Sequence, residues 1–247
     1  MPRMMRLASR LALAACGAGA LSLAVAPGAG AATFSNTTPL SIPASGNASS
    51  YPSGIAVSGI PGPVTDIDVS LNGVSHTSPV DIGVVLVAPS GTALALFDCV
   101  GSGIDAAGLT FTIDDSAATQ LPPTGALTGG SFRPTGHCNP ARSFDAPGPL
   151  TSYAYPGPAR GTSATLASTF NGLDANGTWN LFVRDFLPGD SGQFAGGWSL
   201  TVKPDPAPIG PIETPKPKTK CKKKKKKKGK GATAAAKKSC KKKKKKK

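Results

Sequence analysis

Residues 176–185 read Asn-Gly-Thr-Trp-Asn-Leu-Phe-Val-Arg-Asp, and residues 198–202 read Trp-Ser-Leu-Thr-Val. Each stretch has a large apolar side chain at every second position, beginning with a tryptophan. Because successive side chains of a strand point to opposite faces, this period predicts strands with one buried face. The same alternation occurs at residues 67–71 and 109–113.

Residues 82–88 are nearly all apolar, which predicts a strand covered on both faces. Pro-Gly, Asn-Gly and Asp-Ser-Gly turns separate the alternating stretches, and no stretch has clear helical spacing. Residues 32–202 are long enough for one domain. We therefore expect an all-β fold, an antiparallel β-sandwich of the jelly-roll, galactose-binding-like kind.

The first 31 residues predict export. Three arginines precede an apolar stretch at residues 11–25, and Ala-Gly-Ala follows at residues 29–31. This is the pattern of a cleaved secretory signal. A lipoprotein signal with a lipidated Cys16 is the alternative, although the apolar stretch before Cys16 is short for one. No other segment has about 18 consecutive apolar residues, so we expect a secreted protein without a transmembrane segment.

Charge is divided sharply between the body and the C-terminal part. Residues 32–202 hold 4 Arg and 11 Asp, a formal charge of −7, whereas residues 203–247 hold 21 Lys against one Asp and one Glu, a charge of +19. The quoted net charge of +15 therefore describes no single surface.

The C-terminal part has two segments. Residues 203–219 are rich in proline, which predicts an extended, semi-rigid linker. Residues 220–247 form a polylysine tail, with runs from Lys222 to Lys228 and from Lys241 to Lys247. Such dense like charge predicts disorder and binding to a polyanion, such as an anionic cell-envelope polymer, driven by counterion release. A solubilising tail without a partner is the alternative. The tail lacks arginine and aromatic residues, so sequence-specific nucleic-acid binding is not expected.

Four cysteines follow the predicted signal, and export permits disulfides. We expect Cys99 and Cys138 to be bridged within the body. Cys221 and Cys240, in the tail, pair with each other or with another molecule, and their spacing does not decide between these.

An ordered string of motifs runs through the body: His76-Thr77, Asp81, Pro89-Ser90-Gly91, Asp114-Asp115-Ser116, Asn176-Gly177-Thr178-Trp179, Gly189-Asp190-Ser191-Gly192 and Gly197-Trp198. The string resembles the P domain (P/Homo B domain), which follows the catalytic domain of kexin- and furin-like subtilases. The resemblance covers about residues 42–202 and implies a β-sandwich jelly roll. A Pro- and Gly-rich insertion between Pro134 and Leu166 departs from the family pattern.

The resemblance implies structural roles for the matched residues. These are His76, Pro89, Gly91, Asn176, Gly177, Trp179, Asp190, Gly192 and Trp198.

The residues of subtilase catalysis are not expected here. A subtilase needs Asp, His and Ser in that order, because its serine requires an imidazole base oriented by a carboxylate. Gly161-Thr162-Ser163 and Asp190-Ser191-Gly192 imitate two of the motifs but occur in the reverse order. We expect His76 to be held by packing or a backbone hydrogen bond, and His137 to be an exposed loop residue. The sequence therefore predicts no enzyme activity.

Three functions remain open from the sequence. The first is a noncatalytic binding or stabilising module retained at an anionic surface by its tail. The second is an accessory module or remnant of a separate subtilase. The third is a polyanion-binding protein in which the tail is the functional part.

Acidic residues at the ends of predicted strands suggest structural calcium, which prefers carboxylate and carbonyl oxygens. The candidate ligands are Asp81, Asp114, Asp115, Asp174, Asp185 and Asp190. The alternative is that aspartate favours turns because its side chain bonds nearby backbone amides.

Overall fold

The structure is a computed structural model that describes residues 30–157 and 161–205. The predicted signal except its last two residues, the polylysine tail, and the linker beyond residue 205 lie outside the described residues.

The first sheet has seven strands, and β5 is its central strand. In the order β1-β13-β5-β12-β2 these are β1 (Ala32–Asn36), β13 (Trp198–Pro204), β5 (Val64–His76), β12 (Gly192–Phe194) and β2 (Leu40–Ile42). Strand β8 (Ala106–Ile113) also pairs with β5 and carries β9 (Gly130–Phe132) in parallel. The strand at residues 67–71 is thus part of a much longer one.

The second sheet has six strands, in the order β10-β7-β6-β11-β3, with β4 also paired to β11. They are β10 (Thr135–Gly136), β7 (Ala93–Asp98), β6 (Ile82–Val87), β11 (Gly177–Asp185), β3 (Gly46–Asn47) and β4 (Ser53–Val57). All pairs are antiparallel except β10 with β7.

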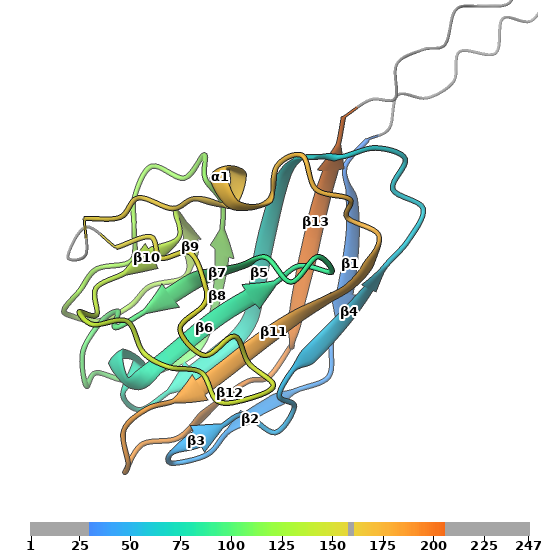
Figure 1. Cartoon of the computed structure of the whole chain (residues 1–247). Helices are drawn as coiled ribbons and strands as arrows, with labels where there is room; N and C mark the ends of the chain where they lie inside the picture. Colours follow the sequence, from blue (N-terminus) through green and yellow to red (C-terminus); the bar gives the residue numbers. More distant parts are fainter. Residues whose placement is uncertain (1–29, 158–160, 206–247) are drawn as a thin grey trace, which may run out of the picture. The chain divides into compact units, whose positions relative to one another are not determined.

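The two sheets pack face to face, with β6 and β11 in one layer and β5, β13 and β1 in the other (Figure 1). The tryptophans that begin the two alternating stretches are fully buried between the layers. Trp198 Nε1 donates to Ser53 Oγ at 3.0 Å, and Trp179 Nε1 donates to the Ala175 carbonyl at 2.9 Å. Because both indole N–H groups have partners, burying the rings leaves no donor unsatisfied. The predicted all-β sandwich is confirmed.

A second, smaller apolar cluster lies on the outer side of the six-stranded sheet. It joins Val85, Ala95 and Phe182 of that sheet to Phe144 and Tyr155 of the insertion. The insertion therefore covers the outer face of β6, β7 and β11. This explains why β6 is buried along nearly its whole length, as its apolar sequence predicted.

Two features differ from expectation. A short helix, α1 (Leu166–Phe170), and a 3₁₀ turn, η1 (Pro79–Asp81), interrupt the strands. Helix α1 begins with a reciprocal cap in which Thr165 Oγ1 accepts from the Ser168 amide and Ser168 Oγ accepts from the Thr165 amide. A five-residue helix held by its cap has too few turns to give a helical period in the sequence.

The last strand continues two residues beyond Val202, since Lys203 pairs with Asp66 and Pro204 with Val64. Strand β13 thus extends to Pro204, beyond the end of the predicted strand. Within the described part of the chain, no helix is long and apolar enough to cross a bilayer.

Candidate functional site

His76 and Asp185 form a buried pair that joins the two sheets. His76 ends β5 and Asp185 ends β11. The distance from His76 Nε2 to Asp185 Oδ2 is 3.1 Å, and both side chains have no exposed surface. The other ring nitrogen, Nδ1, accepts the Ser78 amide at 3.1 Å, so the proton of the neutral ring is on Nε2 and is donated to Asp185.

This arrangement gives His76 a structural role. Burial raises the pKa of Asp185, and the nearby charge of Asp81 raises it further, while the Leu187 amide and His76 oppose the shift. Both nitrogens of the imidazole are engaged, and neither faces a serine or threonine hydroxyl among the described residues. A general base needs a free nitrogen within hydrogen-bond reach of its substrate. His76 is therefore held by the Asp185 carboxylate, which was not an expected partner, and by the Ser78 backbone amide.

The second histidine is only half exposed, which corrects the expectation of a fully exposed loop residue. His137 Nε2 donates to the Leu121 carbonyl at 3.0 Å, and the His137 amide donates to the Asp98 carbonyl. The hydrogen bonds explain the difference, because they draw the insertion's first residues against the end of β7.

Cys99 and Cys138 are joined in a disulfide, with Cα atoms 5.4 Å apart. The bridge ties the residue after β7 to the start of the insertion. Arg142, in the insertion, reinforces the attachment through its Nη1 atom, 3.5 Å from Asp98 Oδ1 and 2.9 Å from the Asp81 carbonyl. Tyr155 also donates to Asp98, at 3.3 Å.

Asp98 is 1% exposed, and its environment opposes ionisation. Burial raises its pKa to about 6, although Arg142 and the Tyr155 hydroxyl favour the charged form. Desolvation thus outweighs a direct ion pair, as is common for interior carboxylates. The sequence pattern did not single out Asp98, because a lone aspartate at a strand end reads as an ordinary turn residue.

The six candidate calcium ligands do not converge on one site among the described residues. Asp81 and Asp185 are buried near each other, and Asp190 is close by, where it accepts from Thr77 Oγ1 at 2.8 Å. Asp114 accepts from the amide and hydroxyl of Ser116.

The remaining two candidates hold local backbone. Asp115 accepts from the Leu166 and Ala167 amides at the start of α1, at 3.0 and 2.7 Å. Asp174 accepts from the amide of Asn176, which lowers its pKa. These contacts are those of aspartate in turns and caps.

Only one group of three potential metal ligands is close enough to share an ion among residues 30–157 and 161–205. It consists of Asp98, Cys99 and Cys138, whose sulfurs are bridged, and includes no candidate calcium ligand. Calcium binding stays a prediction.

Several of the matched motif residues lie where two segments of the chain come close together. Asn176 exchanges two hydrogen bonds with Ile60, at 3.0 and 2.9 Å. A Cβ on Gly192 would lie 2.0 Å from the Ser75 carbonyl oxygen, and one on Gly177 would lie 2.7 Å from the Pro89 ring. Gly91 has a positive φ of 85° in the turn between β6 and β7. Close contacts therefore require glycine at Gly192 and Gly177, whereas the positive φ favours glycine at Gly91.

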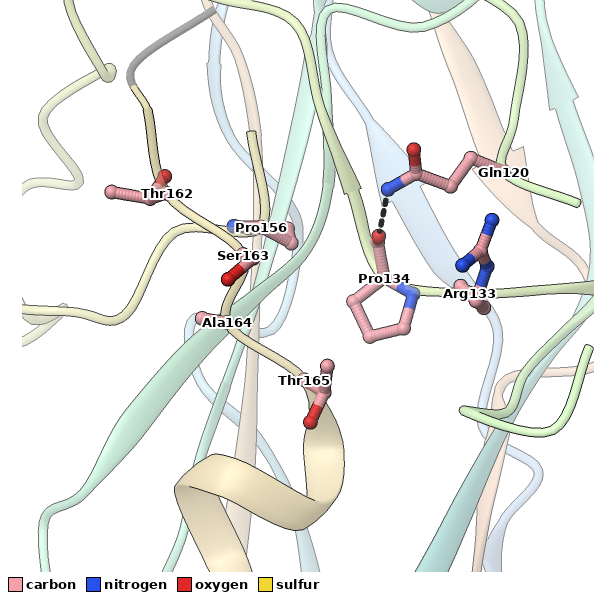
Figure 2. Close-up of a pocket in the computed structure, with 8 residues that line it drawn as sticks. All are labelled: Gln120, Arg133, Pro134, Pro156, Thr162, Ser163, Ala164 and Thr165. Atoms are coloured by element: carbon pink, nitrogen blue, oxygen red, sulfur yellow. Dashed lines mark hydrogen bonds between the residues drawn. The ribbon is translucent and has the colours of Figure 1, made fainter. Parts of the chain in front are cut away.

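A hollow of about 220 Å³ lies where the end of β9 faces the segment that leads into α1. Figure 2 shows Gln120, Arg133 and Pro134 on one side and Pro156 and residues 162–165 on the other. We call this site the Arg133 hollow. Ser163, the serine of the subtilase-like tripeptide, lies on its rim, and neither histidine is among the lining residues. The serine therefore has no imidazole partner among the described residues.

Comparison with known proteins assigns the chain to no family. No family model matches it, and no curated protein matches it. One solved structure is similar, the complex of the Aeromonas sobria serine protease with its chaperone ORF2, at 14% identity and a TM-score of 0.31. The similarity covers 71% of this chain and 27% of the chain in that complex. This chain therefore spans about a quarter of the length of the chain it matches. A likeness at this TM-score supports no inference about function.

Proposed function

We propose that the protein is a noncatalytic extracellular module in which a β-sandwich is held at an anionic surface by the polylysine tail. The separation of charge carries the proposal: the body has a formal charge of −7 and the segment after it +19. An acidic body is repelled by a polyanion, whereas clustered lysines bind one by releasing its counterions. The tail is therefore the part that adheres.

The body supports a noncatalytic role. Both ring nitrogens of His76 are engaged, His137 donates to a backbone carbonyl, and Ser163 has no imidazole beside it among the described residues. The sandwich provides a rigid scaffold, and its function depends on what its surface binds.

Salt dependence with a defined polyanion tests the adhesive role. Long-chain polyphosphate binding is measured by titration across a salt series, for the full chain and for a variant with both seven-lysine runs replaced by glutamine. If at least six phosphates are contacted, the log–log slope of the full chain is about −4 or steeper. The glutamine variant binds weakly with a shallow slope. Equal affinity and slope for the two proteins would exclude the lysine runs as the anchor.

A role beside a protease is the second candidate, favoured by the ordered P-domain-like motifs from His76 to Trp198. In that role the module stabilises a separate secreted subtilase. The test compares the thermal inactivation rate of such a protease from the same cell with and without this protein. Slower inactivation is expected, and an unchanged rate over a wide range of module concentration counts against this candidate.

A further inference from the structure

We propose that the Arg133 hollow binds the free C-terminal carboxylate of a peptide. The hollow would be the ligand site of the sandwich itself, separate from the polyanion binding assigned to the tail. Four features of the described residues support the inference: an arginine without an ion pair among them, polar groups with hydrogen-bonding capacity left over among them, apolar walls of small residues, and a backbone fixed by hydrogen bonds.

Arg133 differs from the other described arginines in its charge environment. Arg142 lies beside Asp98, and Arg184 pairs with Asp145. Arg133 is exposed, and its guanidinium forms no ion pair within residues 30–157 and 161–205. A guanidinium offers two parallel N–H groups that match the two oxygens of a carboxylate. An anionic ligand would supply the missing partner.

Two further lining residues offer hydrogen bonds. The Gln120 Nε2 atom donates to the Pro134 carbonyl at 2.9 Å, which leaves the amide oxygen of Gln120 as an acceptor (Figure 2). Ser163 is exposed, and its hydroxyl has no hydrogen bond in the described part of the chain. The C-terminal residue of a peptide matches these donors and this acceptor. Its carboxylate would accept from Arg133 and Ser163, and its amide N–H would donate to the Gln120 amide oxygen.

The rest of the lining suits a small apolar side chain. Pro134 and Pro156 are buried and Ala164 is half-buried, so these residues present compact apolar walls. The volume of about 220 Å³ admits the end of a chain. No aromatic ring is among the lining residues, so an acidic sugar would lack the flat apolar surface on which a sugar ring packs. A peptide end is therefore favoured over a uronic acid.

The walls are held before any ligand arrives. The Arg133 amide donates to the Thr119 carbonyl at 2.9 Å, and Thr165 is fixed by its reciprocal cap with Ser168. The Thr162 hydroxyl donates to the Gly157 carbonyl at 3.0 Å. Preorganisation reduces the entropy lost on binding, which matters for a contact that consists of one ion pair and a few hydrogen bonds.

Nuclear magnetic resonance on the isotope-labelled full chain tests the proposal at the site itself. The probes are N-acetyl-alanyl-alanine, the same dipeptide with a C-terminal carboxamide, and glucuronate. We expect saturable shifts of the Gln120 and Ser163 amides with the free acid, at a Kd of about 1 mM. The carboxamide should cause none. Because the signals are those of the hollow, ligand held only by the tail does not produce them, and the proposal stands or fails independently of the tail's role.

Variants distinguish the ion pair from general charge. Arg133→Gln should lower the affinity for the free-acid dipeptide by about tenfold or more, since a charged hydrogen bond contributes roughly 1.5–3 kcal/mol. Lys203→Gln removes an exposed charge outside the hollow and should leave the affinity unchanged, while an unaltered spectrum confirms that each variant folds. The proposal is overturned if the free acid causes no saturable shifts, or if the acid and the carboxamide bind equally. It is also overturned if Arg133→Gln keeps full affinity, or if glucuronate binds and the dipeptide acid does not.

Discussion

The side chains of His76 and Asp185 are fully buried, and His76 Nε2 lies 3.1 Å from Asp185 Oδ2. The pair connects the ends of two strands, β5 and β11, that belong to different sheets. The pair is a polar clamp across one edge of the sandwich. Because Nδ1 of the ring is also bonded, to the Ser78 amide, the clamp extends to the turn that leads into β6. An interior hydrogen-bonded pair of this kind constrains register more than it adds stability.

Asp185→Ala should lower the free energy of unfolding by about 3 kcal/mol or more, because it leaves a buried imidazole without its acceptor. Asp190→Ala is the matched control: its carboxylate bonds Thr77 at a less buried site, and its loss should cost about 1 kcal/mol. Urea unfolding of both variants measures the difference. Equal effects would show that the clamp contributes nothing beyond an ordinary surface hydrogen bond.

Asp98 predicts a pH dependence of stability. Its pKa is raised from 3.8 to about 6 by burial, so between these values the folded protein binds a proton that the unfolded chain has released. Stability therefore falls as the pH rises from about 4 to about 6, by roughly 2–3 kcal/mol from this group.

Asp98→Asn removes the contribution of this group and should make that part of the stability curve less steep, although burial also raises the pKa of Asp68 to about 6. Denaturant unfolding at several pH values measures the difference between the two proteins. An identical slope in wild type and variant would mean that Asp98 ionises normally in the folded state. Asp105→Asn serves as the control, because Asp105 is exposed.

The disulfide should stabilise the body as a whole. Replacing Cys99 and Cys138 by serine frees a loop of 39 residues, which costs about 4 kcal/mol on the loop-entropy model. Thermal unfolding of the double variant, compared with a double serine variant of Cys221 and Cys240, measures the effect of the body pair alone. A loss equal to that of the tail variant would contradict a structural role for the bridge.

Phe144 should hold the insertion on the sheet. Its ring packs edge-on against Phe186 at 5.3 Å and Tyr153 at 5.6 Å, and it is 1% exposed. Phe144→Ala should cost about 3–5 kcal/mol, as for other buried aromatics. Hydrogen exchange should increase first in residues 138–155.

Leu150→Ala is the control for Phe144, because Leu150 lies in the same insertion with 53% of its surface exposed. It should change stability by less than about 0.5 kcal/mol. If Phe144→Ala accelerates exchange no more than Leu150→Ala does, the second apolar cluster is not a cohesive layer.

The sandwich was predictable from the sequence because its strands carry a period of two, as Trp179, Leu181 and Val183 illustrate. The two-sided burial of β6 was predictable for a different reason, because its residues are nearly all apolar. The layer that covers it was not, since Phe144 and Tyr155 occur singly among prolines and glycines without any period.

The sites were less accessible to sequence reasoning. Asp185 was identified as an acidic strand end, but its partner His76 lies 109 positions earlier, and only the fold brings the two together. Arg133 lies in a stretch, residues 131–134, that resembles the middle of the P domain, but that resemblance implied no binding role for it. Cys99 and Cys138 were predictable as a pair because both lie in the body and the predicted export would permit a disulfide.

Cosedimentation with the envelope of the producing cell tests whether the polylysine tail is the part that anchors the protein. Full-length protein is compared across a salt series with a version that ends at Asp205, which keeps all of β13 and its pairing to β5. The account predicts that the full-length protein sediments at low salt and is released as salt rises, while the shortened protein stays in solution. Sedimentation of the shortened protein at high salt, to the same extent as the full chain, would contradict it.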